Sequence, residues 1–327
     1  MICQQGYKSN TQGIVLISVL LIFAATTVLV AGLQMAFMRT VKSQGLVAAD
    51  SQVQEYLRGA ELLASIQLQQ DVYNDMQNAE TRDHASEQWA QLQVYPITGG
   101  EIRTQLVDLQ GRFNIMTLAS DQTAQQVFIR LLDELQIPSD NRMTSSDILT
   151  VILDWMDTDQ EQRGFIEAED DYYLSLGSKE DGGYKTSQKP IMHLSELLLL
   201  RGVSKQDYAK LAPYIALLPL DASININSVS LPVARALNVS AGAELVSTRP
   251  EEGFTQEDMS TLSENQRPAM NFNVDSQYFE LRTQIKLGDA LTQQSTIIYV
   301  PASTNAEEIE TPQLFQRDLG WAYYYSL

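Results

Sequence analysis

An uncharged stretch near the start of the chain limits the possible folds more than any other feature. Between Lys8 and Arg39 no charged side chain occurs, and Ile14 to Met38 is almost entirely apolar. As an α-helix this segment would extend about 37 Å, more than the roughly 30 Å hydrocarbon core of a bilayer. A cleaved secretory signal would need a shorter apolar stretch followed by a small-residue cleavage site. The sequence therefore predicts a single membrane-spanning helix over residues 14–38.

The composition limits what the rest of the chain can bind. There are 41 acidic and 22 basic side chains, for a formal net charge of −19. Binding to a phosphate backbone uses an excess of Lys and Arg, so we expect no nucleic acid partner. One cysteine (Cys3) and two histidines (His84 and His193) argue against a zinc site and a Ser-His-Asp enzyme. Charges flanking the span do not fix its orientation, but the acidic bulk favours a body exported to the periplasm.

The pattern beyond the anchor predicts an α+β fold. Apolar residues continue at three- and four-residue steps to about Gln70, so one long helix is expected from about Ile14. Residues 101–109, 279–287 and 295–300 have the composition of strands with one wet face. Between these strand regions the chain is helical in character. We therefore expect a long N-terminal helix packed on an antiparallel sheet, with a large all-helical domain inserted between strands.

These patterns divide the chain into consecutive parts. Residues 241–270 contain Pro250, Gly253 and Pro268 and few large apolar side chains, so they are interpreted as an exposed mobile loop. The expected parts are a leader (1–13), the membrane part of the helix (14–38), the first part of a head domain (39–117), the inserted helical domain (118–220) and the second part of the head (221–327).

An acidic loop is the first candidate site. Asp154 to Asp171 holds eight carboxylates and one arginine, and these like charges would repel one another in a compact turn. Oxygen ligands at short, irregular spacing suit Ca²⁺, which takes six to eight of them. The EF-hand pattern fails, because Gln162 and Ala168 occupy its glycine and glutamate positions. A structural Ca²⁺ site and a solvated acidic loop both remain open on this reasoning.

Two further patterns suggest alternative functions. Residues 194–215 predict two helices joined by a tight turn at Gly202, the layout of a helix-hairpin-helix (SAM-like) motif that can bind DNA phosphates. In so acidic a chain we interpret it as a packing motif. Paired carboxylates could serve a membrane-tethered Ca²⁺-dependent hydrolase. No histidine or nucleophile motif accompanies the acidic loop in the sequence, so we expect no enzyme.

The start of the chain resembles type IV prepilins and type II secretion pseudopilins. A polar leader ends at Gly13 and is followed at once by Ile14, Val15, Leu16 and Ile17. The resemblance implies cleavage between Gly13 and Ile14 by a prepilin peptidase, with methylation of the new N-terminus. In most of that family the fifth mature residue is glutamate, and here it is Ser18. A carboxylate at that depth is costly unless paired with a neighbouring subunit, so Ser18 favours a place at the filament end. The alternative is that Ser18 is simply a polar residue that the helix tolerates.

Four downstream segments resemble the general secretion pathway protein K family, the large minor pseudopilins of type II secretion. They are LVDLQGRFNIMTL, ILDWMDTDQEQRGFIEAEDDYY, KPIMHLSELLLLRGV and SININSVSLPVARAL. The resemblance implies a pilin-like head, structural Ca²⁺ in the inserted domain, and a single-pass inner-membrane protein with a periplasmic body. It also implies a cap on the pseudopilus, formed with the I and J minor pseudopilins, that helps to initiate assembly. The ligands that it suggests for Ca²⁺ are Asp157, Asp159, Glu169 and Asp170. A minor pilin of a type IV pilus is the alternative.

Overall fold

The computed structural model describes residues 11–78, 82–139, 142–166, 168–177, 182–303 and 309–319. The chain divides into two compact units, Met1–Tyr56 and Leu57–Leu327, which are treated separately below. The first unit contributes the first part of helix α1 (Thr11–Asn78). Within it, Val15–Lys42 is long and apolar enough to cross a membrane, and it is the only such helix in the described part of the chain. Most of the predicted leader, and the side chains of Gly13 and Ile14, lie outside the described residues.

The predicted long helix is present and extends further than expected, ending at Asn78 rather than near Gln70. Gly59 costs about 1 kcal/mol relative to alanine in a helix interior, and here it does not interrupt the helix. From Leu57 onward α1 belongs to the second unit, which contains the head and the inserted helices. The predicted α+β class is therefore confirmed.

The second unit is built on a five-stranded antiparallel sheet in the order β1-β2-β7-β8-β9. Its central strand, β7, pairs with β2 along nine residue positions, from Gly100↔Leu287 to Asp108↔Phe279. The strands and their bounds are β1 (Gln93–Ile97), β2 (Gly100–Asp108), β7 (Tyr278–Leu287), β8 (Ala290–Tyr299) and β9 (Gln313–Leu319). Sequence patterns had indicated three of these strands, whereas β1 and β9, the two edges, were not predicted.

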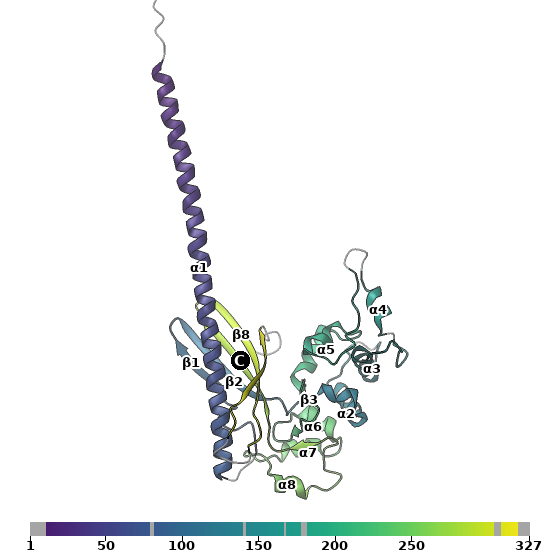
Figure 1. Ribbon diagram of the computed structural model, residues 1–327. Coiled ribbons are helices and arrows are strands. Elements are labelled where there is room, and N and C mark those ends of the chain that lie inside the picture. The colour runs from purple at the N-terminus through teal and green to yellow at the C-terminus, as the bar shows by residue number, and fades with distance from the viewer. Residues whose placement is uncertain are drawn as a thin grey trace, which may run out of the picture. The chain divides into compact units, whose positions relative to one another are not determined.

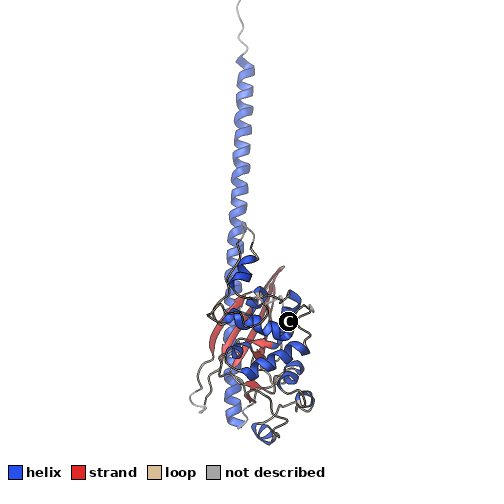
Figure 2. Ribbon diagram, turned by 90° about the vertical axis from the view of Figure 1, so that its right-hand side faces the viewer, coloured by secondary structure: helices blue, strands red, loops and turns tan. Residues whose placement is uncertain are grey.

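The C-terminal part of α1 packs on one face of this sheet (Figures 1 and 2). Ala64 and Leu68 of the helix share a buried cluster with apolar side chains of β2, β7 and β8 and with the indole of Trp89. The other members of the cluster are Leu106, Phe279, Leu281, Ile298 and Val300. This packing is the helix-on-sheet layer that the sequence predicted.

The opposite face of the sheet is not exposed to solvent, although the alternation of apolar and polar residues along the strands had predicted that it would be. Side chains of a strand alternate between faces, so Glu280 and Arg282 point away from α1. Both are nonetheless buried, at 7% and 9% exposed, and they join Arg112 in an ion-pair cluster. Arg112 Nη2 lies 3.0 Å from Glu280 Oε2. The inserted residues cover this face, which is why charged side chains are buried there in paired form.

All residues between β2 and β7 form the insertion, which lies beside the sheet in Figure 1. It consists of short helices and two small parallel strand pairs around one large core. The helices are η1 (Ile115–Ala119), α2 (Gln122–Glu134), α3 (Ser145–Met156), α4 (Asp170–Ser175), η2 (Leu194–Leu199), α5 (Lys205–Leu211), η3 (Ala212–Tyr214), α6 (Leu231–Leu237), α7 (Gly242–Ser247) and α8 (Gln256–Thr261). The strand pairs are β3 (Phe113–Asn114) with β4 (Ile215–Ala216), and β5 (Ile224–Asn225) with β6 (Phe272–Asn273).

The structure differs from the predicted boundaries of the insertion. A single core cluster runs from Phe113 to Val274, so residues after 220 that were assigned to the head pack with the inserted helices. The exposed mobile loop expected at 241–270 is also corrected, because α7 and α8 lie there and Met259 is only 3% exposed. A capping box between Thr255 and Asp258 starts α8, a local signal that composition alone does not reveal.

Candidate functional site

The acidic loop begins at the end of α3, a helix whose start is fixed by a Thr144–Asp147 capping box. Asp154 lies in the last turn, three residues after the buried Val151, on the face that packs into the core. Its side chain is 0% exposed, and neither oxygen has a hydrogen-bond partner. Asp157 follows as the residue that ends the helix. Burial of an ionisable group without hydrogen bonds is costly, so Asp154 marks a place where a cation would be favourable.

Two more carboxylates leave oxygens without partners near Asp154. Both Oε atoms of Glu169, the residue that precedes α4, are buried without a hydrogen bond, and so is Oδ1 of Asp157. The neighbouring positive charge is Arg163, whose Nη2 lies 2.7 Å from Asp157 Oδ2 and whose Nε lies 3.5 Å from Asp154 Oδ1. One half-exposed guanidinium thus faces several carboxylates, and buried oxygens of these carboxylates still have no hydrogen-bond partner.

The electrostatics agree with this picture. Burial raises the pKa of Asp154 to about 6. Burial, followed by repulsion from Asp154, Asp157, Asp159 and Asp170, raises the pKa of Glu169 to about 7. The carboxylates therefore share one neighbourhood in which negative charge is poorly compensated. Such a donor set, all oxygen and all acidic, fits a hard cation such as Ca²⁺.

The four residues suggested as ligands do not behave alike. Asp157 and Glu169 contribute the unpaired oxygens described above. Asp159 is exposed, and its Oδ1 accepts a hydrogen bond from Glu161 N at 2.8 Å. Asp170 Oδ1 accepts from Thr186 N and Oγ1 at 2.9 and 2.8 Å, and its Oδ2 lies 3.2 Å from Lys185 Nζ. Asp154, which was not among the four, is the most buried carboxylate of the group.

Aromatic side chains hold the loop in place. Trp155 is buried beside Asp154, and its ring contacts Tyr173 and Tyr184 edge to face at centroid distances of 5.4 and 6.3 Å. Its carbonyl accepts a hydrogen bond from Gln188 N at 3.1 Å, which ties the later loop to the end of α3. The carboxylates are thus carried by a packed substructure, in keeping with an ordered loop.

The helix-hairpin-helix segment packs into the core of the insertion. Its two helices, η2 and α5, are joined through Gly202 at φ +83°. Leu197, Tyr208 and Leu211 from these helices are members of the large core cluster. Asp207 caps α5 and also accepts hydrogen bonds from Ser139 N and Oγ. These contacts agree with the interpretation of the segment as a packing motif.

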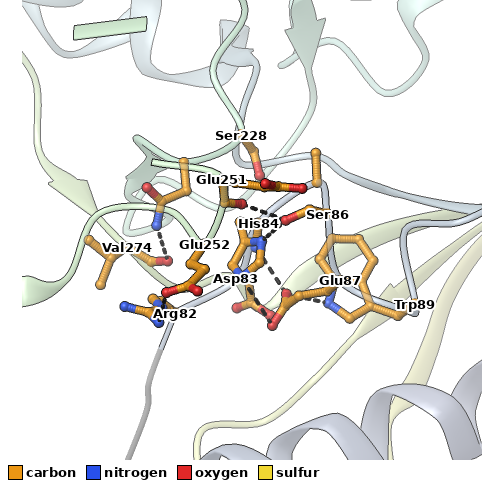
Figure 3. Close-up of polar contacts among 12 residues, drawn as sticks. Arg82, Asp83, His84, Ser86, Glu87, Trp89, Ser228, Glu251, Glu252 and Val274 are labelled. Carbon is orange, nitrogen blue, oxygen red and sulfur yellow. Dashed lines mark hydrogen bonds and ion pairs between the residues drawn. The ribbon is translucent and has the colours of Figure 1, made fainter. Parts of the chain in front are cut away.

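Both histidines make structural contacts. His193 Nδ1 accepts from Ser195 N at 3.1 Å and so caps η2, while its Nε2 lies 2.6 Å from Asp318 Oδ2 on β9. His84 Nδ1 lies 2.7 Å from the hydroxyl of Ser86, which donates to the carbonyl of Glu251 (Figure 3). His84 thus helps to hold the loop after α1 against the segment at Glu251, and His193 links the insertion to β9.

Ser18, the predicted determinant of filament position, lies in the candidate membrane span, where its side chain is exposed. The span Val15–Lys42 contains no acidic residue, and its basic residues, Arg39 and Lys42, lie at its C-terminal end. The first carboxylate after it is Asp50. The span Val15–Lys42 thus contains no carboxylate that would need an ion-pair partner within the membrane core.

Comparisons with known proteins agree with these features. A family model described as "Type II secretion system (T2SS), protein K" matches residues 111–220. Type II secretion system protein K of Pseudomonas aeruginosa is 32% identical to this chain over 300 residues, which cover 86% of each chain. The protein of the same name from Pectobacterium carotovorum is 28% identical over 323 residues, which cover 90% of this chain and 94% of the relative. A chain from the crystal structure of the GspK-GspI-GspJ complex of enterotoxigenic Escherichia coli has the same fold, with a TM-score of 0.67 and 24% identity over 86% of this chain and 99% of its own. This chain therefore belongs to the type II secretion system protein K family, the large minor pseudopilins of that secretion system.

Proposed function

We propose that this chain caps the tip of the periplasmic pseudopilus, together with the I and J minor pseudopilins, and helps to initiate its assembly. The observation that carries the proposal is the position of the insertion. Residues 109–277 leave the sheet between β2 and β7, two strands that pair directly with each other. A pilin-like head with so large an addition can stack on subunits below it, but it would obstruct further subunits above it.

The anchor supports a terminal position. A subunit with a carboxylate in its span gains from a neighbour's N-terminal amine, because an unpaired charge in the membrane costs several kcal/mol. With Ser18 at this place the chain requires no such partner on that side. Its own N-terminal amine, created by cleavage between Gly13 and Ile14 by the prepilin peptidase, can still pair with the subunit below.

The acidic loop is proposed as a structural Ca²⁺ site. The buried unpaired oxygens of Asp154, Asp157 and Glu169 support this role. We keep Asp159 and Asp170 as outer ligands that would reach the ion after rearrangement, since one is exposed and the other is engaged by Thr186 and Lys185. The ion would supply the positive charge that Arg163 alone does not provide, and would hold α3 and α4 together.

We further propose that the body lies in the periplasm and the anchor in the inner membrane, and that the protein has no enzymatic activity. Membership in the secretion family favours this function over the alternative of a type IV minor pilin. The hydroxyl of Ser86 donates to a backbone carbonyl, and Ser195 accompanies a helix-capping histidine, so both serine-histidine contacts have a structural explanation.

Co-purification tests the proposed function. The full chain, extracted in detergent, is mixed with the I and J subunits of the same organism in Ca²⁺ and passed over a sizing column. A complex containing all three subunits is expected, and its yield should fall after chelation. Migration of the chain apart from I and J under both conditions would contradict the tip assignment while leaving the fold and anchor unaffected. Placement is then checked by labelling the head on isolated pseudopili, where the label should be found at one end only.

A further inference from the structure

Strand β9 forms one edge of the sheet, and side-chain contacts fasten it on both of its faces. Successive side chains of a strand point to opposite faces. Arg317 faces α1, where its Nε lies 2.6 Å from Oε1 of Glu61. Asp318 faces the insertion, where its Oδ2 lies 2.6 Å from Nε2 of His193. Because an edge strand pairs with only one neighbour, here β8, such contacts contribute directly to how firmly it is held.

The contact between His193 and Asp318 bridges a loosely packed seam. A cavity of about 120 Å³ lies between the insertion and the sheet, and both of these side chains line it. Leu194 of the insertion, Ile297 of β8 and Gln316 of β9 also line this cavity. Since the cavity replaces close packing here, the polar contact is a main connection between β9 and the insertion.

The hydrogen bonds at the start of η2 fix the ring of His193. Its Nδ1 accepts from Ser195 N at 3.1 Å and lies 2.6 Å from Ser195 Oγ. With Nδ1 as the acceptor, this network assigns the proton of the neutral imidazole to Nε2. His193 therefore donates to Asp318 Oδ2 from a fixed direction.

Glu196 connects His193 to the end of α3. Its Oε1 accepts from Met192 N and His193 N at 2.8 and 3.0 Å, which completes the capping box of η2. Its Oε2 accepts from the indole Nε1 of Trp155 at 3.3 Å. One carboxylate thus joins the backbone at His193 to the last turn of α3.

Trp155 connects Glu196 to the acidic loop. It is 3% exposed and directly follows Asp154, whose buried oxygens have no hydrogen-bond partner. Its ring contacts Tyr173 in α4, the helix that Glu169 precedes. An ion held by Asp154 and Glu169 would therefore fix both elements that hold the indole. Together the contacts form a relay of side chains from the acidic loop to β9, namely Trp155, Glu196, His193 and Asp318.

We propose that this relay transmits the occupancy of the acidic loop to β9, so that β9 is held more firmly on the sheet when Ca²⁺ is bound. The inference rests on the Ca²⁺ site proposed above. Without the ion, repulsion among the carboxylates of the loop loosens the end of α3, and the indole of Trp155 loses its fixed position against Glu196. The element with two states is β9, either paired with β8 or frayed, and the loop biases this equilibrium.

Hydrogen–deuterium exchange of the full chain in detergent, with chelator or with saturating Ca²⁺, tests the proposal. The side chains of His193 and Asp318 are 40% and 39% exposed, so their contact has the strength of a surface pair, and Ca²⁺ should slow exchange of the β9 amides about threefold. Amides of α3 and α4 should also slow, which shows that the loop is loaded. Slower exchange there without a change in β9 would overturn the relay and leave the Ca²⁺ site standing. No change in either region would overturn both.

Asp318→Ala removes the acceptor on β9. In this variant β9 should exchange at the same rate with chelator and with Ca²⁺, while α3 and α4 still respond to the ion. Gln316→Ala is the matched control, because Gln316 lines the same cavity from the same face of β9 and makes no side-chain hydrogen bond within the described part of the chain. A Ca²⁺ effect on β9 that survives Asp318→Ala would overturn the relay.

Glu196→Gln tests the middle of the relay. The amide oxygen can keep the capping bonds of η2, whereas the amide NH₂ would meet the indole N–H of Trp155 as a second donor. The Ca²⁺ effect on β9 should be lost here too. Glu87→Gln is the control, because Glu87 also accepts from an indole, that of Trp89 at 2.7 Å, but lies outside the relay. Equal responses of β9 in the two variants would contradict the proposal.

Calcium affinity gives a second readout. Coupling between two sites is reciprocal, so a variant that disconnects β9 should weaken Ca²⁺ binding by the factor with which Ca²⁺ protects β9, about threefold. Calcium titration of Asp318→Ala against Gln316→Ala measures this difference. Equal affinities of the two variants would show that β9 and the acidic loop are independent.

Discussion

Glu61 on α1 and Arg317 on β9 form a two-bond ion pair, with Nε 2.6 Å from Oε1 and Nη2 2.8 Å from Oε2. Glu61 is 4% exposed, whereas the Arg317 side chain is 54% exposed. Gln294 Nε2 and Thr296 Oγ1, both on β8, also donate to Glu61 Oε1 at 2.9 and 3.0 Å. The pair therefore connects the helix to the last strand of the sheet across β8.

Arg317→Met should destabilise the head, because it leaves a buried carboxylate with only neutral donors. Removing one partner of a buried charged hydrogen bond costs about 1 to 3 kcal/mol, and the exposure of Arg317 places the expected loss toward the lower end. Chemical denaturation measures the free energy of unfolding. Arg103→Met is a matched control, since Arg103 pairs with Glu101 at a more exposed place. An equal loss in both variants would contradict a special role for the Glu61 pair.

The same pair predicts an acid-sensitive contribution to stability. Burial tends to raise the pKa of Glu61, but hydrogen bonds from Arg317 and Thr296 and the charge of Arg317 outweigh it and lower the pKa. A carboxylate with a lowered folded-state pKa stabilises the protein above its unfolded pKa and loses this contribution as pH falls through the folded value. Between about pH 5 and pH 3 the free energy of unfolding should therefore fall more steeply in the native chain than in Glu61→Gln. Parallel slopes would exclude this linkage.

Gly202 is expected to tolerate a methyl group poorly. It has φ +83°, and a Cβ there would lie 2.2 Å from Met143 Sδ and 3.1 Å from Ile148 Cδ1. Gly288 has φ +58° with no atom within 4 Å of its Cβ position. Alanine in the left-handed region costs about 1 to 2 kcal/mol at either place, and repacking adds about 1 to 3 kcal/mol at Gly202 alone. Thermal unfolding of the two variants should show a clearly larger loss for Gly202→Ala, and equal losses would refute the packing argument.

Calcium should raise the melting temperature of the native chain, because a ligand that binds only the folded state adds about 2.7 kcal/mol at a hundredfold excess over Kd. This shift reports on the acidic loop, which is the proposed Ca²⁺ site. Glu169→Gln should abolish most of it, since both Glu169 oxygens are buried and unpaired. Asp159→Asn should reduce it less, because Asp159 is exposed. A larger effect at Asp159 than at Glu169 would reverse the assignment of inner and outer ligands.

The sequence predicted those elements whose signal is local. The long helix and strands β2 and β7 have clear periodicity. The observed bounds of β2 and β7 lie within one residue of the predicted ones, whereas the helix ends about eight residues later than predicted. Strand β1 was missed because Pro96 interrupts the pattern, which an edge strand tolerates. Strand β9 was missed because most of its side chains are exposed, so no clean alternation exists. The assignment of residues after 220 failed because long-range packing into the core from Phe113 to Val274 decides it.

The same limit applies to the acidic loop. Its charge density is evident in the sequence, but the sequence does not tell which oxygens are left without partners. Asp170 is engaged by Thr186, sixteen positions later, a contact that only the tertiary fold creates. Asp154 could have been chosen from its place on the apolar face of α3, because a carboxylate three residues after a buried valine must be paired or ligated.

Ser18→Glu should disturb placement at the tip. The new carboxylate would lie within the membrane span Val15–Lys42, where a charge costs several kcal/mol unless a neighbouring amine pairs with it. A subunit that carries it gains by having another subunit above, which favours positions along the filament or stalls initiation. Cross-linking to the I and J subunits and export of a secreted protein measure this, and Ser18→Ala is the control that removes the hydroxyl without adding charge. We expect Ser18→Ala to behave like the native chain and Ser18→Glu to lose cross-links to I and J. Equal cross-linking and export in all three would mean that the residue at this position does not set the place of the subunit.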